Sequence, residues 1–205
     1  MQKINSGQAV RLPVICSLIE RRAAMKNLTA AFIGQRPSLF LWGYDEEDDD
    51  CLKLKQLLVE QIAALIDNGV TNFISDMAWG TDLFCAEMVV GLKRCLFPQL
   101  QLICVLPSEE QAAKWSPQQR KRYYDTLEHA DQTIYMQHHV SQEGVFKCHR
   151  WLVEHSHFLL AVHNGAHKGS AYAVSRYAQA EGRAVIVVNP DNLTVEPWTV
   201  HDIKI

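Results

Sequence analysis

The sequence contains no apolar run that approaches the ~20 residues needed to cross a bilayer. Its formal net charge is only −3, so no cationic field favours nucleic acid or an anionic membrane surface. Residues 1–24 do not read as a secretory signal, because their short apolar patch is interrupted by Pro13 and followed by Glu20 and two arginines. We therefore expect no membrane partner, no nucleic acid partner and a cytoplasmic location.

Cysteine and histidine patterns with metal-binding spacing are also missing. The six cysteines include no C-x-x-C pair and several lie in apolar segments, so buried free thiols in a reducing compartment are expected: Cys16, Cys51, Cys85, Cys95, Cys104 and Cys148. Histidines cluster late in the chain without H-E-x-x-H or another ligand spacing, so we predict no native metal site: His138, His139, His149, His155, His157, His163 and His167.

Short apolar runs alternate with amphipathic segments along most of the chain. We expect strands at 28–33, 71–75, 100–106, 132–136, 158–162 and 184–188. Expected helices cover 51–67, 80–96, 109–114, 117–129, 141–154 and 169–181. Strands that are continuous Val, Ile and Leu runs are typical of a parallel sheet covered on both faces. The pattern predicts an α/β fold, a Rossmann-like three-layer sandwich with a mostly parallel central sheet.

One domain is expected at this length, and it spans residues 28–190. Residues 191–205 form a C-terminal tail that can add an edge strand. Residues 1–27 form an N-terminal extension, because the regular pattern begins only near Met25. For residues 1–24 two hypotheses remain, a start site assigned too early and an N-terminal helix packed on the domain.

Three loops follow predicted strands and would meet at one edge of the sheet, where open α/β sheets bind ligands. They are residues 34–37, 75–82 and 164–171. The first supplies Arg36, whose planar fork suits phosphate or carboxylate. The other two place glycine and hydroxyl residues at helix N-termini, where free N–H groups and the helix dipole favour an anion. Neither G-x-G-x-x-G nor G-K-[ST] occurs, and the alternative is that the glycines only make turns and Arg36 pairs with a surface carboxylate.

Carboxylates and aromatic residues near these loops are the remaining candidates. Asp82 and Glu87 would serve as catalytic carboxylates if the protein cleaved an N-glycosidic bond, although Asp82 can equally cap its helix. Trp79 lies inside the second loop and is the best candidate to stack a base, ahead of Trp115, Tyr123 and Tyr124. The acidic run 45–50 precedes a helix, so we expect a solvated cap rather than a divalent-cation site.

These motifs resemble the SLOG superfamily of nucleotide-ligand-binding proteins, in its YpsA-like branch. The matching stretches are 33–37, 44–48, 73–87, 111–115, 130–131, 151–156, 159–162 and 169–174. The resemblance covers about residues 28–190 and implies a Rossmann-like fold with a pocket for a nucleotide or nucleotide derivative. The residues it implies around the ligand are Gly34, Gln35, Arg36, Ser75, Asp76, Met77, Trp79, Gly80, Thr81, Lys168, Gly169 and Ser170.

The chain departs from the branch at five places. Gln35 replaces the usual His, Asp76 replaces Gly, Cys148-His149 replaces Arg-Asn, His157 replaces Asp, and Lys168-Gly169-Ser170 replaces Gly-Gly-Thr. An inward-facing Asp76 would repel a phosphate and favour a ribose hydroxyl or a cation. The Pro-Gly-Gly-x-Gly-Thr loop of the superfamily's phosphoribohydrolases is absent, which disfavours their reaction.

Three functions follow in order of preference, and whether the chain is an enzyme stays undecided. The first is binding or sensing of a nucleotide-type small molecule, the second is N-glycosidic bond cleavage, and the third is a degenerate member acting through protein contacts. No cofactor is assigned beyond the nucleotide-like ligand. A homo-oligomer is left open, since related Rossmann-like proteins often pair through helices.

Overall fold

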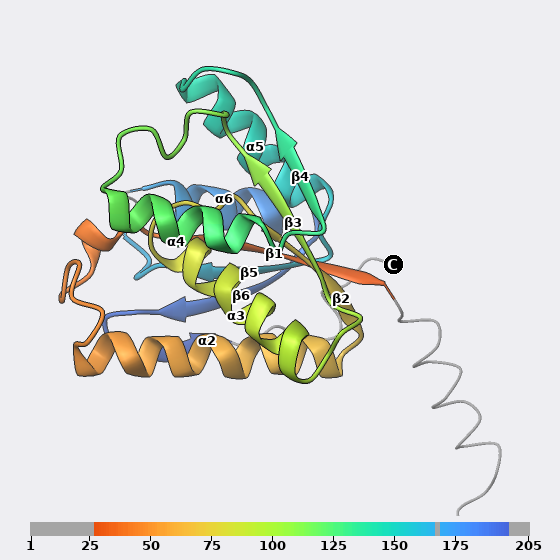
Figure 1. Cartoon of the computed structure of the whole chain (residues 1–205). Coiled ribbons are helices and arrows are strands. Elements are labelled where there is room, and N and C mark those ends of the chain that lie inside the picture. The colour runs from red at the N-terminus through yellow and green to blue at the C-terminus, as the bar shows by residue number, and fades with distance from the viewer. Residues whose placement is uncertain (1–26, 167–168, 197–205) are drawn as a thin grey trace, which may run out of the picture.

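The computed structural model describes residues 27–166 and 169–196 (Figure 1). Residues 1–26 of the N-terminal extension, Lys168 and most of the tail lie outside these residues. The strands are β1 Leu28–Gly34, β2 Val70–Ser75, β3 Gln101–Leu106, β4 Gln132–Tyr135, β5 Phe158–Val162, β6 Ala184–Asn189 and β7 Thr194–Glu196. The helices are α2 Asp49–Asp67, α3 Thr81–Cys95, α4 Pro117–Leu127, α5 Gln142–Glu154 and α6 Ser170–Ala180, with a 3-10 turn at Pro37–Leu39.

All seven strands form one sheet in the order β4-β3-β2-β1-β5-β6-β7. Every neighbouring pair is parallel except β6 and β7, which are antiparallel. The chain builds outward from β1 to β4 on one side and then restarts at β5 on the other. The strand order therefore switches between β1 and β5, and the carboxyl ends of these two strands bound the crevice where such folds bind ligands.

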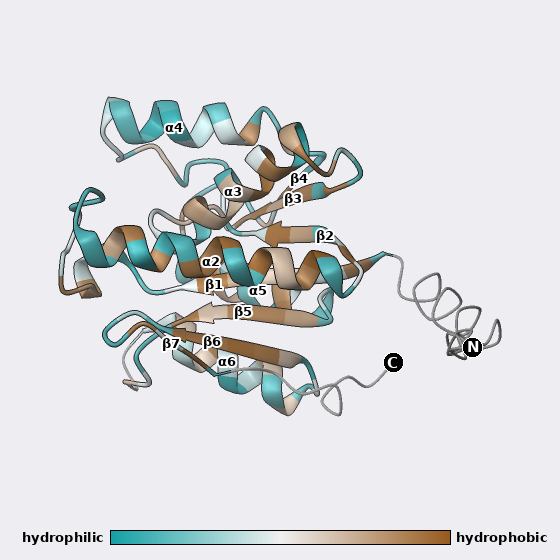
Figure 2. Cartoon of the chain, turned by 90° about the horizontal axis from the view of Figure 1, so that it is seen from below, coloured by the Kyte–Doolittle hydropathy of each residue, from teal (hydrophilic) through white to brown (hydrophobic). Residues whose placement is uncertain are grey.

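Both faces of the sheet are buried, as the apolar strand pattern predicts. In β1, Ala30 and Phe32 join the core formed with α2 and α3, whereas Ala31 and Ile33 join the core formed with α5 and α6. This alternation follows from the two-residue period of a strand. Figure 2 shows the apolar residues concentrated on the central strands, while α4 is mostly hydrophilic. The predicted Rossmann-like sandwich is confirmed.

The predicted helix at 109–114 is wrong. This segment forms consecutive turns, with i→i+3 bonds from the N–H of Ala113 to Glu110 O at 3.0 Å and from Trp115 to Ala112 O at 3.1 Å. A six-residue segment offers too few i→i+4 bonds to offset helix nucleation. The next helix begins with its own N-cap at Ser116, whose side chain accepts from the N–H of Gln119 in a capping box.

Other boundaries agree with the sequence patterns. Asp48 caps α2 by accepting the N–H of Asp50 at 2.8 Å, so part of the acidic run is a helix cap. The tail adds β7 to the edge of the sheet. Within residues 27–166 and 169–196, no helix combines the length and apolarity needed to cross a membrane.

Candidate functional site

A cavity of about 370 Å³ lies where the carboxyl ends of β1, β2 and β3 meet the start of α6. The register of the parallel strands brings the loops after these three strands to one edge of the sheet. Six residues predicted from sequence line this cavity: Gly34, Arg36, Asp76, Trp79, Asp82 and Ser170. The loops that were expected to meet therefore do meet.

A second cavity of about 360 Å³ adjoins the first. Arg36, His149 and Ser170 line both cavities, and the second also contains the predicted residues Gln35 and Gly169. Within the described part of the chain Arg36 makes no ion pair with a carboxylate. The guanidinium remains available to an anion in either cavity.

Four further predicted residues shape the elbow between β2 and α3 instead of lining the cavity: Ser75, Met77, Gly80 and Thr81. Ser75 Oγ accepts the N–H of Met77 at 3.0 Å and donates to Asp82 O at 2.9 Å. Met77 is fully buried with a φ of 58°, and Gly80 has a φ of 116°. A Cβ at Gly80 would lie 2.9 Å from Cδ of Pro37, so the elbow needs glycine for both conformation and space.

Two helices begin at the cavity without a side-chain cap. The N-caps of α3 and α6 are Gly80 and Gly169, and neither helix has a side-chain cap hydrogen bond. A Cβ at Gly34 would lie 2.3 Å from Cβ of Thr81, so the end of β1 touches the first residue of α3. Uncapped first-turn N–H groups at a cavity are suited to an anionic ligand.

Asp82 is a buried carboxyl group, only 2% exposed. Its Oδ2 accepts the N–H of Gly34 at 3.3 Å, while its Oδ1 has no hydrogen-bond partner among the described residues. Burial, together with the nearby charge of Asp76, raises the pKa of Asp82 well above its usual range. A carboxyl group in this setting holds its proton more readily than an exposed aspartate.

Asp76 and His149 lie against each other in the cavity wall. Asp76 Oδ1 accepts the N–H of Ala78 at 2.9 Å, and Asp76 Oδ2 lies 3.5 Å from His149 Nε2. Both residues are more than nine-tenths buried. They are two of the positions at which the sequence departs from the YpsA-like pattern, so two departures distant in sequence meet in space.

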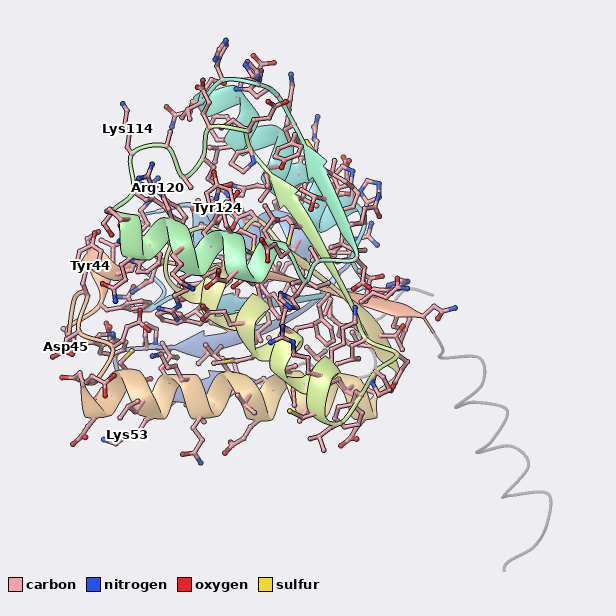
Figure 3. The ribbon with its side chains drawn as sticks, viewed as in Figure 1. Tyr44, Asp45, Lys53, Lys114, Arg120 and Tyr124 are labelled. Carbon is pink, nitrogen blue, oxygen red and sulfur yellow. The ribbon has the colours of Figure 1, made fainter. Side chains whose placement is uncertain are left out.

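Glu87 is not brought to this cavity. Both of its carboxylate oxygens accept from the guanidinium of Arg122, which also donates to Glu46 at 2.6 Å. The Arg122 guanidinium lies over the rings of Trp79 at 5.5 Å and Phe84 at 5.2 Å. The loop that carries Tyr44 and Asp45 accordingly lies beside the start of α4 (Figure 3). Arg122 thus packs on the ring of Trp79 and helps to hold it in place.

Aromatic residues form one wall of the cavity. Trp79 packs edge-on against Trp115 at 5.7 Å between ring centroids, and Trp115 packs against Tyr123 at 5.3 Å. Trp79, Trp115 and Tyr44 line the cavity. Tyr123 is buried behind them, and Tyr124 is about half exposed on α4.

The lining residues outside the predicted site set include Ser108, Gln111 and His149. Ser108 and Gln111 follow β3, whose carboxyl end lies at the same edge as the three loops considered. The rule that selected those loops applies equally to this fourth loop. His149 had no local signal apart from its departure from the family pattern.

One group of exposed side chains within the described residues has the spacing to hold a cation: Glu110, His138 and His139. His139 Nδ1 lies 3.3 Å from Glu110 Oε1. His138 Nδ1 lies 2.7 Å from Glu109 Oε2. These residues do not line the cavity, and the sequence-based expectation of no native metal site remains a prediction.

Fold and site together define a Rossmann-like protein with a ligand-sized cavity at the switch point of its sheet. A family model described as the YspA SLOG family matches residues 31–193, and the chain belongs to this family. A UPF0398 protein of Halalkalibacterium halodurans is 40% identical over 78 residues, which cover 38% of this chain and 41% of that protein. A UPF0398 protein of Bacillus licheniformis is 27% identical over 181 residues, covering 84% of this chain and 97% of that protein.

Proposed function

We propose that this protein binds or senses a nucleotide or a nucleotide derivative in the cavity at the switch point. One observation supports the proposal: Arg36, the first residue of α6 and two tryptophan rings line the same cavity. Arg36 and the uncapped start of α6 supply donors for phosphate, and Trp79 and Trp115 offer ring surface to a base. The volume of about 370 Å³ falls in the range of small-molecule sites.

The proposal is tested by thermal shift and calorimetry with nucleoside mono-, di- and triphosphates. Replacing Arg36 with Met is expected to weaken binding by about tenfold or more, because a charge-assisted contact to phosphate is lost. Arg120→Met is the matched control, since Arg120 is exposed on α4 and does not line either cavity (Figure 3). The proposal is refuted if none of the nucleotides stabilises the protein. It is also refuted if the two variants lose the same amount of binding affinity.

A second candidate, cleavage of an N-glycosidic bond, is favoured by the state of Asp82. A carboxyl group with a raised pKa in a ligand cavity is suited to protonate a leaving base. Release of base from nucleoside monophosphates would then disappear in Asp82→Asn. Glu87→Gln would retain it, because Glu87 is engaged by Arg122 away from the cavity. No base release from any of the four ribonucleoside monophosphates would rule this candidate out.

A further inference from the structure

Three buried oxygen atoms without a hydrogen-bond partner among the described residues belong to residues that line the cavity. They are Asp82 Oδ1, Ser108 Oγ and Gln111 Oε1. Buried polar atoms are almost always hydrogen-bonded, because an unmet group costs folding free energy. Because all three belong to residues around one cavity, we expect them to form hydrogen bonds with a bound ligand.

The unpartnered atoms and Asp76 Oδ2 form a mixed set, in which Asp76 Oδ2 and Gln111 Oε1 accept and a protonated Asp82 can donate from Oδ1. The amide nitrogen of Gln111 already donates to Asp76 O at 2.9 Å, which leaves Oε1 of the same side chain as an acceptor. Ser108 Oγ can donate or accept. A phosphate group carries no donor to satisfy such a set, and the charge of Asp76 repels it. Neutral hydroxyl groups, which both donate and accept, fit the set.

The groups of this set lie at one end of the continuous site. Asp76, Asp82 and Gln111 line only the first cavity, whereas the donors Arg36 and Ser170 line the second as well. A nucleotide shows the same arrangement, because its sugar carries the phosphate at one end and hydroxyl groups beside it. His149 lines both cavities and lies 3.5 Å from Asp76 Oδ2, so it stands between the two ends.

We propose that Asp76, Asp82, Ser108 and Gln111 form a subsite for the vicinal hydroxyl groups of a ribose. This inference rests on the proposed function and extends it, because it specifies a ribonucleotide-type ligand and rejection of its 2′-deoxy counterpart. A site built to bond a hydroxyl group discriminates against the analogue that lacks it, since buried polar groups are then left unmet.

The experiment compares AMP, GMP, CMP and UMP with their 2′-deoxy counterparts by calorimetry in the presence of EDTA. The wild-type protein is expected to bind the best ribonucleotide at least about tenfold more tightly than its deoxy form. Ser108→Ala removes no hydrogen bond within the described protein and should reduce this ratio by about threefold or more. Asp76→Asn keeps an oxygen for the N–H of Ala78 and should reduce the ratio as well.

Ser156→Ala is the matched control. Its hydroxyl group is also buried and unpartnered among the described residues, but Ser156 does not line the cavity, so the ratio should be unchanged. If Asp76→Asn fails to fold, Ser108→Ala alone decides the question.

The outcomes separate this inference from the function on which it rests. Equal binding of ribo- and deoxynucleotides would overturn the subsite and leave the nucleotide site standing. Binding of none of them, and of none of the corresponding di- and triphosphates, would overturn both. Discrimination that appears only after Mg²⁺ is added would also overturn the subsite, because the carboxylates would then be metal ligands.

Discussion

The contact between the end of β1 and the start of α3 makes Gly34→Ala a sharp test of the structure. The added Cβ would lie 2.3 Å from Thr81 Cβ, 2.6 Å from Thr81 Oγ1 and 2.8 Å from Thr81 Cγ2. Thr81 is 1% exposed at the first position of α3, so the crowded atoms have little room to move. Gly34 does not adopt a left-handed φ, so the penalty comes from the contact alone.

Overpacking of this kind typically costs about 1–3 kcal/mol. For a protein of this size each kcal/mol shifts Tm by about 2–4 °C, so Gly34→Ala should lower Tm by about 2–12 °C. The matched control is Gly91→Ala on the exposed face of α3, where a Cβ meets nothing within 4 Å. That substitution should raise the free energy of unfolding by about 0.5–1 kcal/mol, because alanine favours the helix.

Urea denaturation and scanning calorimetry measure both effects. In a double-mutant cycle, Thr81→Gly removes all three crowded atoms, so Gly34→Ala in that background should lose most of its penalty. Stability losses that simply add in the double variant would refute the proposed contact. An unchanged Tm in Gly34→Ala would refute the close approach of β1 to α3.

Three further outcomes are expected from urea denaturation. Arg122→Met should lower the free energy of unfolding by about 1–2 kcal/mol, because one guanidinium joins Glu46 and Glu87, whereas Arg120→Met should change it by less than about 0.5 kcal/mol. Asp82→Asn should be more stable than wild type at pH 7 and should lose this advantage toward pH 4. Because folding raises the pKa of Asp82, its contribution to stability is present below the pKa that Asp82 has in the unfolded chain. That contribution is lost as the pH rises through the pKa of Asp82 in the folded protein. Burial lowers the pKa of His163, so its contribution to stability is present above about pH 6.5 and is lost as the pH falls through the pKa of His163 in the folded protein. His163→Gln should therefore reduce the loss of unfolding free energy that the wild type shows between pH 7 and 5. An equal loss in both proteins would contradict this.

Much of the architecture could be predicted because the central strands are buried on both faces. Apolar runs such as residues 158–162 are then continuous and have clear ends. Since parallel strands share one carboxyl edge, knowing where each strand ends was enough to bring Arg36, Asp76 and Ser170 together. Those predictions needed no knowledge of side-chain direction.

The errors arose where side-chain direction or distant contacts decide the outcome. Glu87 lies on the same helix as Asp82, but helical spacing turns it toward Arg122, which is 35 residues away in sequence. The approach of His149 to Asp76 depends on how α5 packs, and no local pattern encodes that packing. The short segment at 109–114 has helical composition, yet the two prolines near its ends leave it too short to form a helix.

The left-handed backbone of Met77 has a consequence for the kinetics of ligand capture. A buried residue other than glycine holds a φ of 58° there, a conformation that costs about 1 kcal/mol or more. Its side chain is packed in the core and its N–H donates to Ser75 Oγ. The conformational free energy is therefore spent during folding and not during ligand binding. The elbow is therefore preorganised, and association should require little backbone rearrangement on that wall of the cavity.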